Sequence, residues 1–132
     1  MAKQRRIEGL ASERGQAMTE LAIVLPIFLT ILFAVVQFGS VWRDYITLTD
    51  AARAGARKAA VSRHGDPKQA GCDQVKATAG DLRKPVTCSV VLSGPAERPD
   101  VTVKASYPYN VTILGITIAS GDLKTETTEL ME

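Results

Sequence analysis

The sequence predicts an α+β protein, in which a long amino-terminal transmembrane helix packs against a short helix and a small antiparallel β-meander. Three observations predict this fold. Residues 21–38 form an apolar run without a single charged side chain. The residues after it keep a helical spacing of apolar and small side chains as far as Arg63. From Lys84 onward, apolar residues recur at every second position, which is typical of strands.

The first fifteen residues, MAKQRRIEGLASERG, are polar and basic. The chain has 16 basic and 14 acidic residues and a net charge of +2. Four of the basic and two of the acidic residues lie in this segment, so the remainder has 12 of each and no net charge. Basic residues beside an apolar run favour the cytoplasmic side, so we expect a cytoplasmic amino terminus. The neutral remainder argues against a nucleic-acid partner.

The apolar run LAIVLPIFLTILFAVVQF is long enough to cross a bilayer core of about 30 Å as a helix. It exceeds the apolar core of a secretory signal peptide and no small-residue cleavage site follows it, so we expect it to be retained. With Trp42 at the interface, the predicted span is 21–42. Pro26 lacks an N–H, which predicts a helix kink or a proline that the membrane helix simply tolerates.

The junction RGQAMTEL places a lone carboxylate, Glu20, at the edge of this run. One interpretation is a carboxylate in the first helical turn, favoured by the helix dipole. The other requires cleavage after Gly15, which creates an α-ammonium group on Gln16. That amine and Glu20 of a neighbouring subunit would then neutralise each other in a bundle of low dielectric constant.

Beyond the span, one helix face changes from large to small side chains and ends near Arg63. This face packs either on the globular part of the same chain or on neighbouring subunits. Gly65 then predicts a helix end, and Asp66 with Pro67 predicts the start of a second helix that reaches about Leu82. We assign no chemistry to the single histidine, His64.

The carboxyl-terminal part predicts a meander of three or four strands. The first two are expected at Val86–Leu92 and Val101–Tyr107, where apolar residues alternate with other residues. A third is expected at Val111–Ala119, broken near Gly115. A turn at residues 120–122 would separate it from a last strand at Leu123–Leu130.

Two cysteines, Cys72 and Cys88, follow the apolar run and would lie outside the cytoplasm. In an oxidising compartment they predict a structural disulfide that closes a loop of about 15 residues. A metal or redox pair is disfavoured, because the spacing is not C-x-x-C. No serine-histidine-aspartate set, phosphate-binding loop or H-E-x-x-H motif is present in the sequence. We therefore expect neither an enzyme nor a cofactor.

The stretch from Arg14 to Arg63 resembles the TadE-like family, the pseudopilins of tight-adherence (Tad) pilus systems within the type IV pilin superfamily. The resemblance rests on GQAMTEL, AIVLPIFLTILFAVVQFG and DAARAGARKAA. The chain departs from the family pattern at Leu21 and Gln37, where relatives often carry an aromatic residue and a glutamate. The resemblance implies a pilin-like fold, processing between Gly15 and Gln16, and an assembly role for Glu20.

The resemblance also implies three segments, namely a leader at 1–15, a long helix at 16–63 and an extracytoplasmic domain at 64–132. The expected partners are a prepilin peptidase, other pilin subunits, an inner-membrane assembly platform and the lipid bilayer. The protein would leave the bacterial cytoplasmic membrane for an extracellular adhesive pilus, as a minor or initiating subunit. The alternatives are a major filament subunit, and a permanent single-pass anchor with a small extracytoplasmic binding domain.

Overall fold

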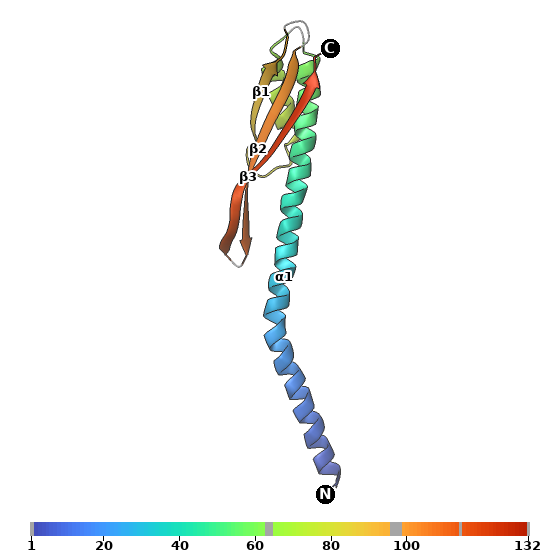
Figure 1. Cartoon of the computed structure of the whole chain (residues 1–132). Coiled ribbons are helices and arrows are strands. Elements are labelled where there is room, and N and C mark those ends of the chain that lie inside the picture. Colours follow the sequence, from blue (N-terminus) through green and yellow to red (C-terminus); the bar gives the residue numbers. More distant parts are fainter. Residues whose placement is uncertain (1, 63–64, 96–98, 114, 132) are drawn as a thin grey trace. The chain divides into compact units, whose positions relative to one another are not determined.

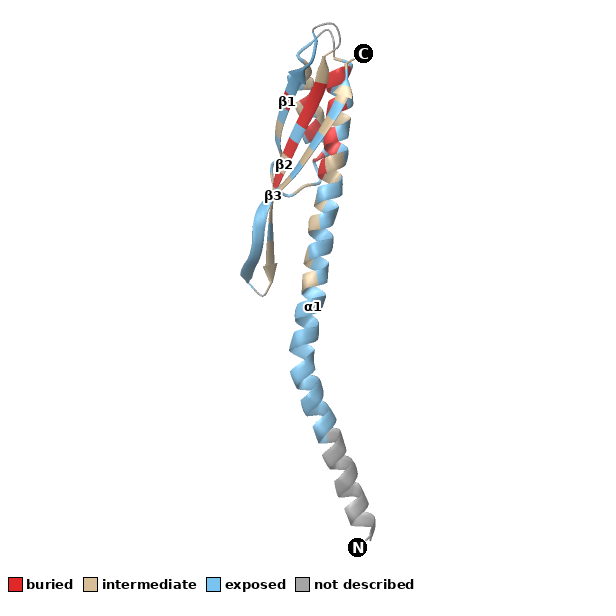
Figure 2. Ribbon diagram, in the orientation of Figure 1, coloured by how far each residue is buried: buried red, intermediate tan, exposed pale blue. Residues whose placement is uncertain are grey.

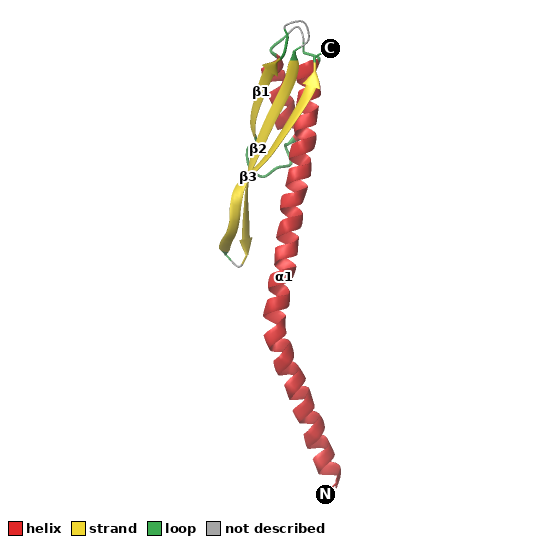
Figure 3. Cartoon of the chain, viewed as in Figure 1, coloured by secondary structure: helices red, strands yellow, loops and turns green. Residues whose placement is uncertain are grey.

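The computed structural model describes residues 2–62, 65–95, 99–113 and 115–131, and their side chains from Gly15 onward. Two helices and three strands follow each other in these residues (Figures 1 and 3). They are α1 (Ala2–Ala60), α2 (Pro67–Thr78), β1 (Thr87–Ser93), β2 (Asp100–Ile113) and β3 (Ile116–Leu130). The predicted α+β class is thus confirmed. The chain divides into two compact units, Met1–Gln37 and Phe38–Glu132.

The first unit consists of the amino-terminal part of α1, which is helical through Pro26. The second unit contains the rest of α1, whose helical assignment ends at Ala60, three residues before the predicted end at Arg63. Val61 and Ser62 continue only as a turn, in which the Ser62 N–H donates to Ala59 O at 3.2 Å. His64 lies outside the described residues.

The start of α2 is the one that the sequence predicted. The Asp66 side chain accepts a hydrogen bond from the Lys68 backbone N–H at 2.9 Å, and Pro67 occupies the first turn. The predicted end near Leu82 is wrong, because the helix stops at Thr78 with Ala79 as its cap. Gly80 follows, and a glycine costs about 1 kcal/mol relative to alanine in a helix interior, which favours this earlier end.

The three strands form one antiparallel sheet in the order β1-β2-β3. The predicted turn at residues 120–122 is wrong, because β3 is continuous from Ile116 and Gly121 pairs with Tyr109. The chain reverses instead before Ile116, where Gly115 has a positive φ of 83°. The Tyr109 ring lies over Gly121, where a Cβ would be 3.2 Å from its Cε1 atom. Gly121 therefore provides room for an aromatic ring rather than a bend.

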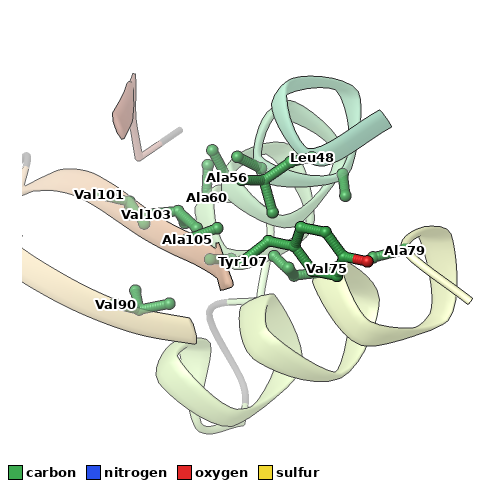
Figure 4. Packing of buried hydrophobic residues seen from close by; sticks show 13 residues of the cluster. Leu48, Ala56, Ala60, Val75, Ala79, Val90, Val101, Val103, Ala105 and Tyr107 are labelled. Atoms are coloured by element: carbon green, nitrogen blue, oxygen red, sulfur yellow. The ribbon is translucent and has the colours of Figure 1, made fainter. Parts of the chain in front are cut away.

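The core of the second unit lies between α1, α2 and the sheet (Figures 2 and 4). Four alanines near the carboxyl-terminal end of α1 are fully buried, and they belong to one cluster with apolar residues of α2 and β2. The fully or almost fully buried members are Leu48, Ala51, Ala52, Ala56, Ala59, Val75, Val101, Val103, Ala105 and Tyr107. The predicted small-residue face of the helix therefore packs on its own domain.

Glycines allow α1 and α2 to approach closely at the centre of this core. A Cβ on Gly71 would lie 3.0 Å from Ala59 Cβ and 3.3 Å from Gly55 O. A Cβ on Gly55 would lie 2.8 Å from Gly71 O. Small residues at these positions let two helix backbones come into contact, which fixes α2 against α1.

Candidate functional site

Residues 15–20 of α1 form the first candidate site, and all six are exposed. The Gln16 Nε2 atom donates a hydrogen bond to Glu20 Oε1 at 3.3 Å, one helical turn away. The Thr19 hydroxyl donates to the Gly15 carbonyl oxygen at 3.0 Å. The structure thus brings the predicted residues Gly15, Gln16 and Glu20 together within about one turn. It adds Thr19, which sequence reasoning missed because hydroxyl bonds to the carbonyl four residues back occur in many helices.

The carbonyl that Thr19 contacts belongs to the Gly15–Gln16 peptide bond, where the sequence predicts cleavage. Glycine and the back-bonding hydroxyl both weaken a helix locally, the glycine by about 1 kcal/mol relative to alanine. The backbone there is nevertheless helical on both sides of the bond. The contact of Gln16 with Glu20 leaves the second carboxylate oxygen without a hydrogen bond to any described residue.

The segment after Glu20 presents an apolar surface that nothing in its own unit covers (Figure 2). Its large side chains between Met18 and Phe38 are from 39% to 70% exposed. Among the described residues, one helix segment, Gly15–Ala60, is long and apolar enough to cross a membrane, and its most apolar window is entirely unburied. A contiguous apolar surface of this kind marks contact with lipid or with other proteins.

Pro26 lies inside this apolar segment. Its carbonyl oxygen accepts a hydrogen bond from the Thr30 hydroxyl at 2.8 Å. The proline ring removes one backbone donor, and a threonine that bonds to the carbonyl four residues back also tends to bend a helix. The kink at Pro26 stays a prediction, now with a second residue that favours it.

Cys72 on α2 and Cys88 on β1 are joined by a disulfide, as the sequence predicted. Their Cα atoms are 5.6 Å apart, within the range that a disulfide spans without moving the backbone. Both side chains pack against the buried cluster. The bond ties α2 to the edge strand of the sheet and so stabilises the domain that follows the apolar segment.

The described part of the chain shows no cluster of side chains suited to metal binding. It contains no group of three or more His, Cys, Asp or Glu residues that could hold a metal ion. An open groove of about 520 Å³ lies on the sheet, and its polar lining includes Lys104, Lys124 and Glu126. Lys104 pairs with Glu126 at 3.4 Å in that groove, and the remaining lining side chains are mostly hydroxyls. Among the described residues, no hydroxyl of this lining is hydrogen-bonded to Lys104, Lys124 or Glu126, which is the contact that would activate it as a nucleophile.

Comparison with known proteins gives one result for the first site. Residues 15–57 match the model of a family described as TadE-like protein. The match begins at Gly15 and covers Glu20, the apolar segment and the buried Ala51, Ala52 and Ala56. No curated protein and no solved structure matches the chain.

Proposed function

We propose that this chain, of which residues 15–57 match the TadE-like family, is a pilin-like subunit that is processed after Gly15 and assembled into a Tad pilus. The family is structural rather than enzymatic. A prepilin peptidase would remove residues 1–15 at the cytoplasmic face, and an inner-membrane platform would move the processed chain into the filament. Family precedent favours a minor or initiating role over that of the major subunit.

The uncovered apolar segment is the observation that supports this proposal most strongly. Its large apolar side chains are from 39% to 70% exposed, so they need either lipid or other helices around them. Each large side chain that leaves water contributes about 1.5–3 kcal/mol. A helix held in lipid can exchange lipid contacts for protein contacts at little net cost, because lipid tails are as apolar as leucine. Storage in the membrane followed by burial in a filament fits this surface.

Glu20 would direct the assembly step. In the uncut chain its carboxylate accepts a hydrogen bond from the neutral Gln16 amide. Cleavage after Gly15 would give residue 16 a positive charge and make Glu20 part of the first helical turns, where the helix dipole favours an acid. A charge-assisted hydrogen bond is roughly twice as strong as a neutral one. The processed amine of one subunit and Glu20 of the next would therefore hold adjacent helices in register.

The test replaces Glu20 in cells that lack the wild-type protein. We expect Glu20→Ala to be processed normally, as judged by mobility on gels. The amount of the variant in sheared pili should fall at least about tenfold, because loss of a buried charge pair worth about 1.4 kcal/mol or more changes an equilibrium constant by that factor. Glu20→Gln keeps the shape and loses the charge, so it should fail to the same degree. Asp50→Ala, which alters an exposed acid of the same helix, is the matched control. Normal incorporation of both Glu20 variants would exclude the charge pair.

The uninterrupted helix across Gly15–Gln16 also fits the alternative of a permanent single-pass anchor that keeps its leader. Such an anchor would retain the apolar helix in lipid and present the disulfide-bonded domain outside the membrane. The two proposals differ in the amino-terminal residue of the protein that cells contain.

A further inference from the structure

The β2–β3 hairpin extends well beyond the rest of its sheet (Figure 1). β1 pairs with β2 from Ser93↔Asp100 only as far as Thr87↔Ser106, whereas β2 and β3 continue to Ile113↔Ile116. Tyr107, which is 3% exposed, is the last buried residue along β2. We call residues 109–121 the distal hairpin.

The distal hairpin is uncharged and partly apolar. It contains no Asp, Glu, Lys, Arg or His, and the charged residues that flank it in the sequence are Lys104 and Asp122. Ile116 and Ile118 are 70% and 64% exposed. Ile116 pairs with Ile113, which lies on the same face of β2 as the buried Val101 and Val103, so the apolar face of the core continues into solvent. In a protein with 23% charged residues, an uncharged and exposed apolar segment of this kind indicates a surface that contacts lipid or another protein.

The backbone edges of the hairpin discourage a further strand from pairing with it. On the β2 edge, Pro108 lacks an N–H, and Lys84 donates from its Nζ atom to Asn110 Oδ1 at 2.8 Å. On the β3 edge, the register shifts between Val111 and Thr112, which leaves a bulge in the opposite strand. Proline, lysine and bulges at edges all disfavour strand addition by a second chain. The contact surface is therefore made by side chains rather than by backbone groups.

The hairpin reaches the level at which the apolar segment of α1 ends. Leu48 is the first buried residue along α1, and it belongs to the same core cluster as Tyr107. From Leu48 back to Phe38, α1 covers about 15 Å, and from Tyr107 to Ile113 a strand covers about 20 Å. Within this unit, the distal hairpin extends from the sheet in the direction in which α1 runs from Leu48 back to Phe38 (Figure 1). Its tip therefore lies near the level of Phe38.

Aromatic residues of α1 occupy that same level. The ring centroids of Phe38 and Trp42 are 6.4 Å apart, and those of Trp42 and Tyr45 are 6.0 Å apart. All three side chains are at least 36% exposed. Tryptophan and tyrosine are enriched at the boundary between a bilayer and water. This group marks the plane in which the membrane would end, and the distal hairpin ends near the same plane.

We propose that the distal hairpin is a second contact with the lipid bilayer, with Ile116 and Ile118 in the headgroup layer where α1 leaves the membrane. The contact is shallow, because unpaired backbone edges cannot enter the hydrocarbon core. It orients the disulfide-bonded domain over the membrane before assembly. The inference rests on the proposed membrane span but on neither processing nor pilus assembly.

The test uses single tryptophan probes in the full chain, reconstituted into phosphatidylcholine nanodiscs. Trp42 is the only tryptophan, so Trp42→Phe provides a silent background. Ile116→Trp probes the hairpin, and Phe28→Trp, within the span, is the positive control. Val91→Trp is the water-exposed control, because Val91 lies on β1 and is 43% exposed. Quenching is measured with aqueous iodide and with lipids that carry bromine at the headgroup end of their acyl chains.

We expect the bromolipids to quench the probes at 28 and 116 but not the probe at 91. Iodide should quench residue 116 roughly half as well as residue 91, because an interfacial segment keeps one side in water. Full iodide access and no bromolipid quenching at 116, with quenching at 28 intact, would overturn the proposal while leaving the span in place. A third outcome is that residue 116 is shielded from iodide but is not quenched by bromolipids. If this shielding disappears in nanodiscs that hold one chain each, a second copy of the chain covers the hairpin, and the proposal is overturned. Absence of quenching at 28 would refute the span itself and the hairpin contact with it.

Discussion

Gly55 lies where α1 and α2 come closest, and a single added methyl group there tests how the domain is held together. In Gly55→Ala, the new Cβ would overlap Val75 Cγ2 and lie 2.8 Å from the Gly71 carbonyl oxygen. Neither neighbour can move easily, because valine is stiff at χ1 and the oxygen belongs to the α2 backbone. The substitution therefore forces the two helices apart.

Two opposing effects determine the size of the change. Alanine is the better helix former by about 1 kcal/mol. Overpacking of a dense core costs about 1–3 kcal/mol, and contact with a fixed backbone atom favours the upper end. We expect a net loss of about 1–2 kcal/mol in the free energy of unfolding. For a domain of this size, that lowers Tm by roughly 5–15 °C.

The assay is thermal unfolding of the full chain in detergent micelles, followed by near-ultraviolet circular dichroism. This signal reports on packed tyrosines such as Tyr107, which is 3% exposed, rather than on the apolar helix. Gly39→Ala is the matched control, since the same change on the same helix meets no atom within 4 Å. A Tm for Gly55→Ala equal to or above that of wild type would refute the close packing of α1 on α2.

The same assay checks two further expectations. Asp66→Ala removes the acceptor of the Lys68 N–H, so it should lower the free energy of unfolding by about 1 kcal/mol and the Tm by several degrees. Asp73→Ala, at an exposed position in α2, is the control and should have little effect. An equal effect of the two aspartate variants would contradict the capping role. Replacing both Cys72 and Cys88 by serine should lower the free energy of unfolding by about 3 kcal/mol, since the disulfide closes a loop of about 15 residues. An unchanged Tm would show that the disulfide does not stabilise the domain.

The fold could be predicted from the sequence wherever the signal is local. A charge-free apolar run, an Asp-Pro helix start and alternating strands each depend on neighbouring residues, and each is found in the structure. The sequence predicts the hairpin turn at the wrong place, because two glycines, Gly115 and Gly121, both suit a turn. Gly115 has the positive φ, whereas Gly121 accommodates the Tyr109 ring from the opposite strand. Only the packing between strands distinguishes them, and local sequence does not contain it.

The candidate site was found through a different kind of signal. Gly15 and Glu20 stand out by their spacing in a family pattern, and the structure adds the contacts that Gln16 and Thr19 make with them. The sequence does not determine what covers the small-residue face, because alanines suit the chain's own domain and a neighbouring subunit equally well. The closeness of Gly55 to Gly71 decides it in favour of the chain's own domain.

The most direct test of the proposed function is the mass of the amino-terminal peptide of the protein isolated from its native host. Processing after Gly15 requires the chain to begin at Gln16, and Gly15→Val should leave the leader attached. A wild-type chain that begins at Met1 or Ala2, and that is missing from sheared surface filaments, would contradict the proposal and leave a single-pass anchor.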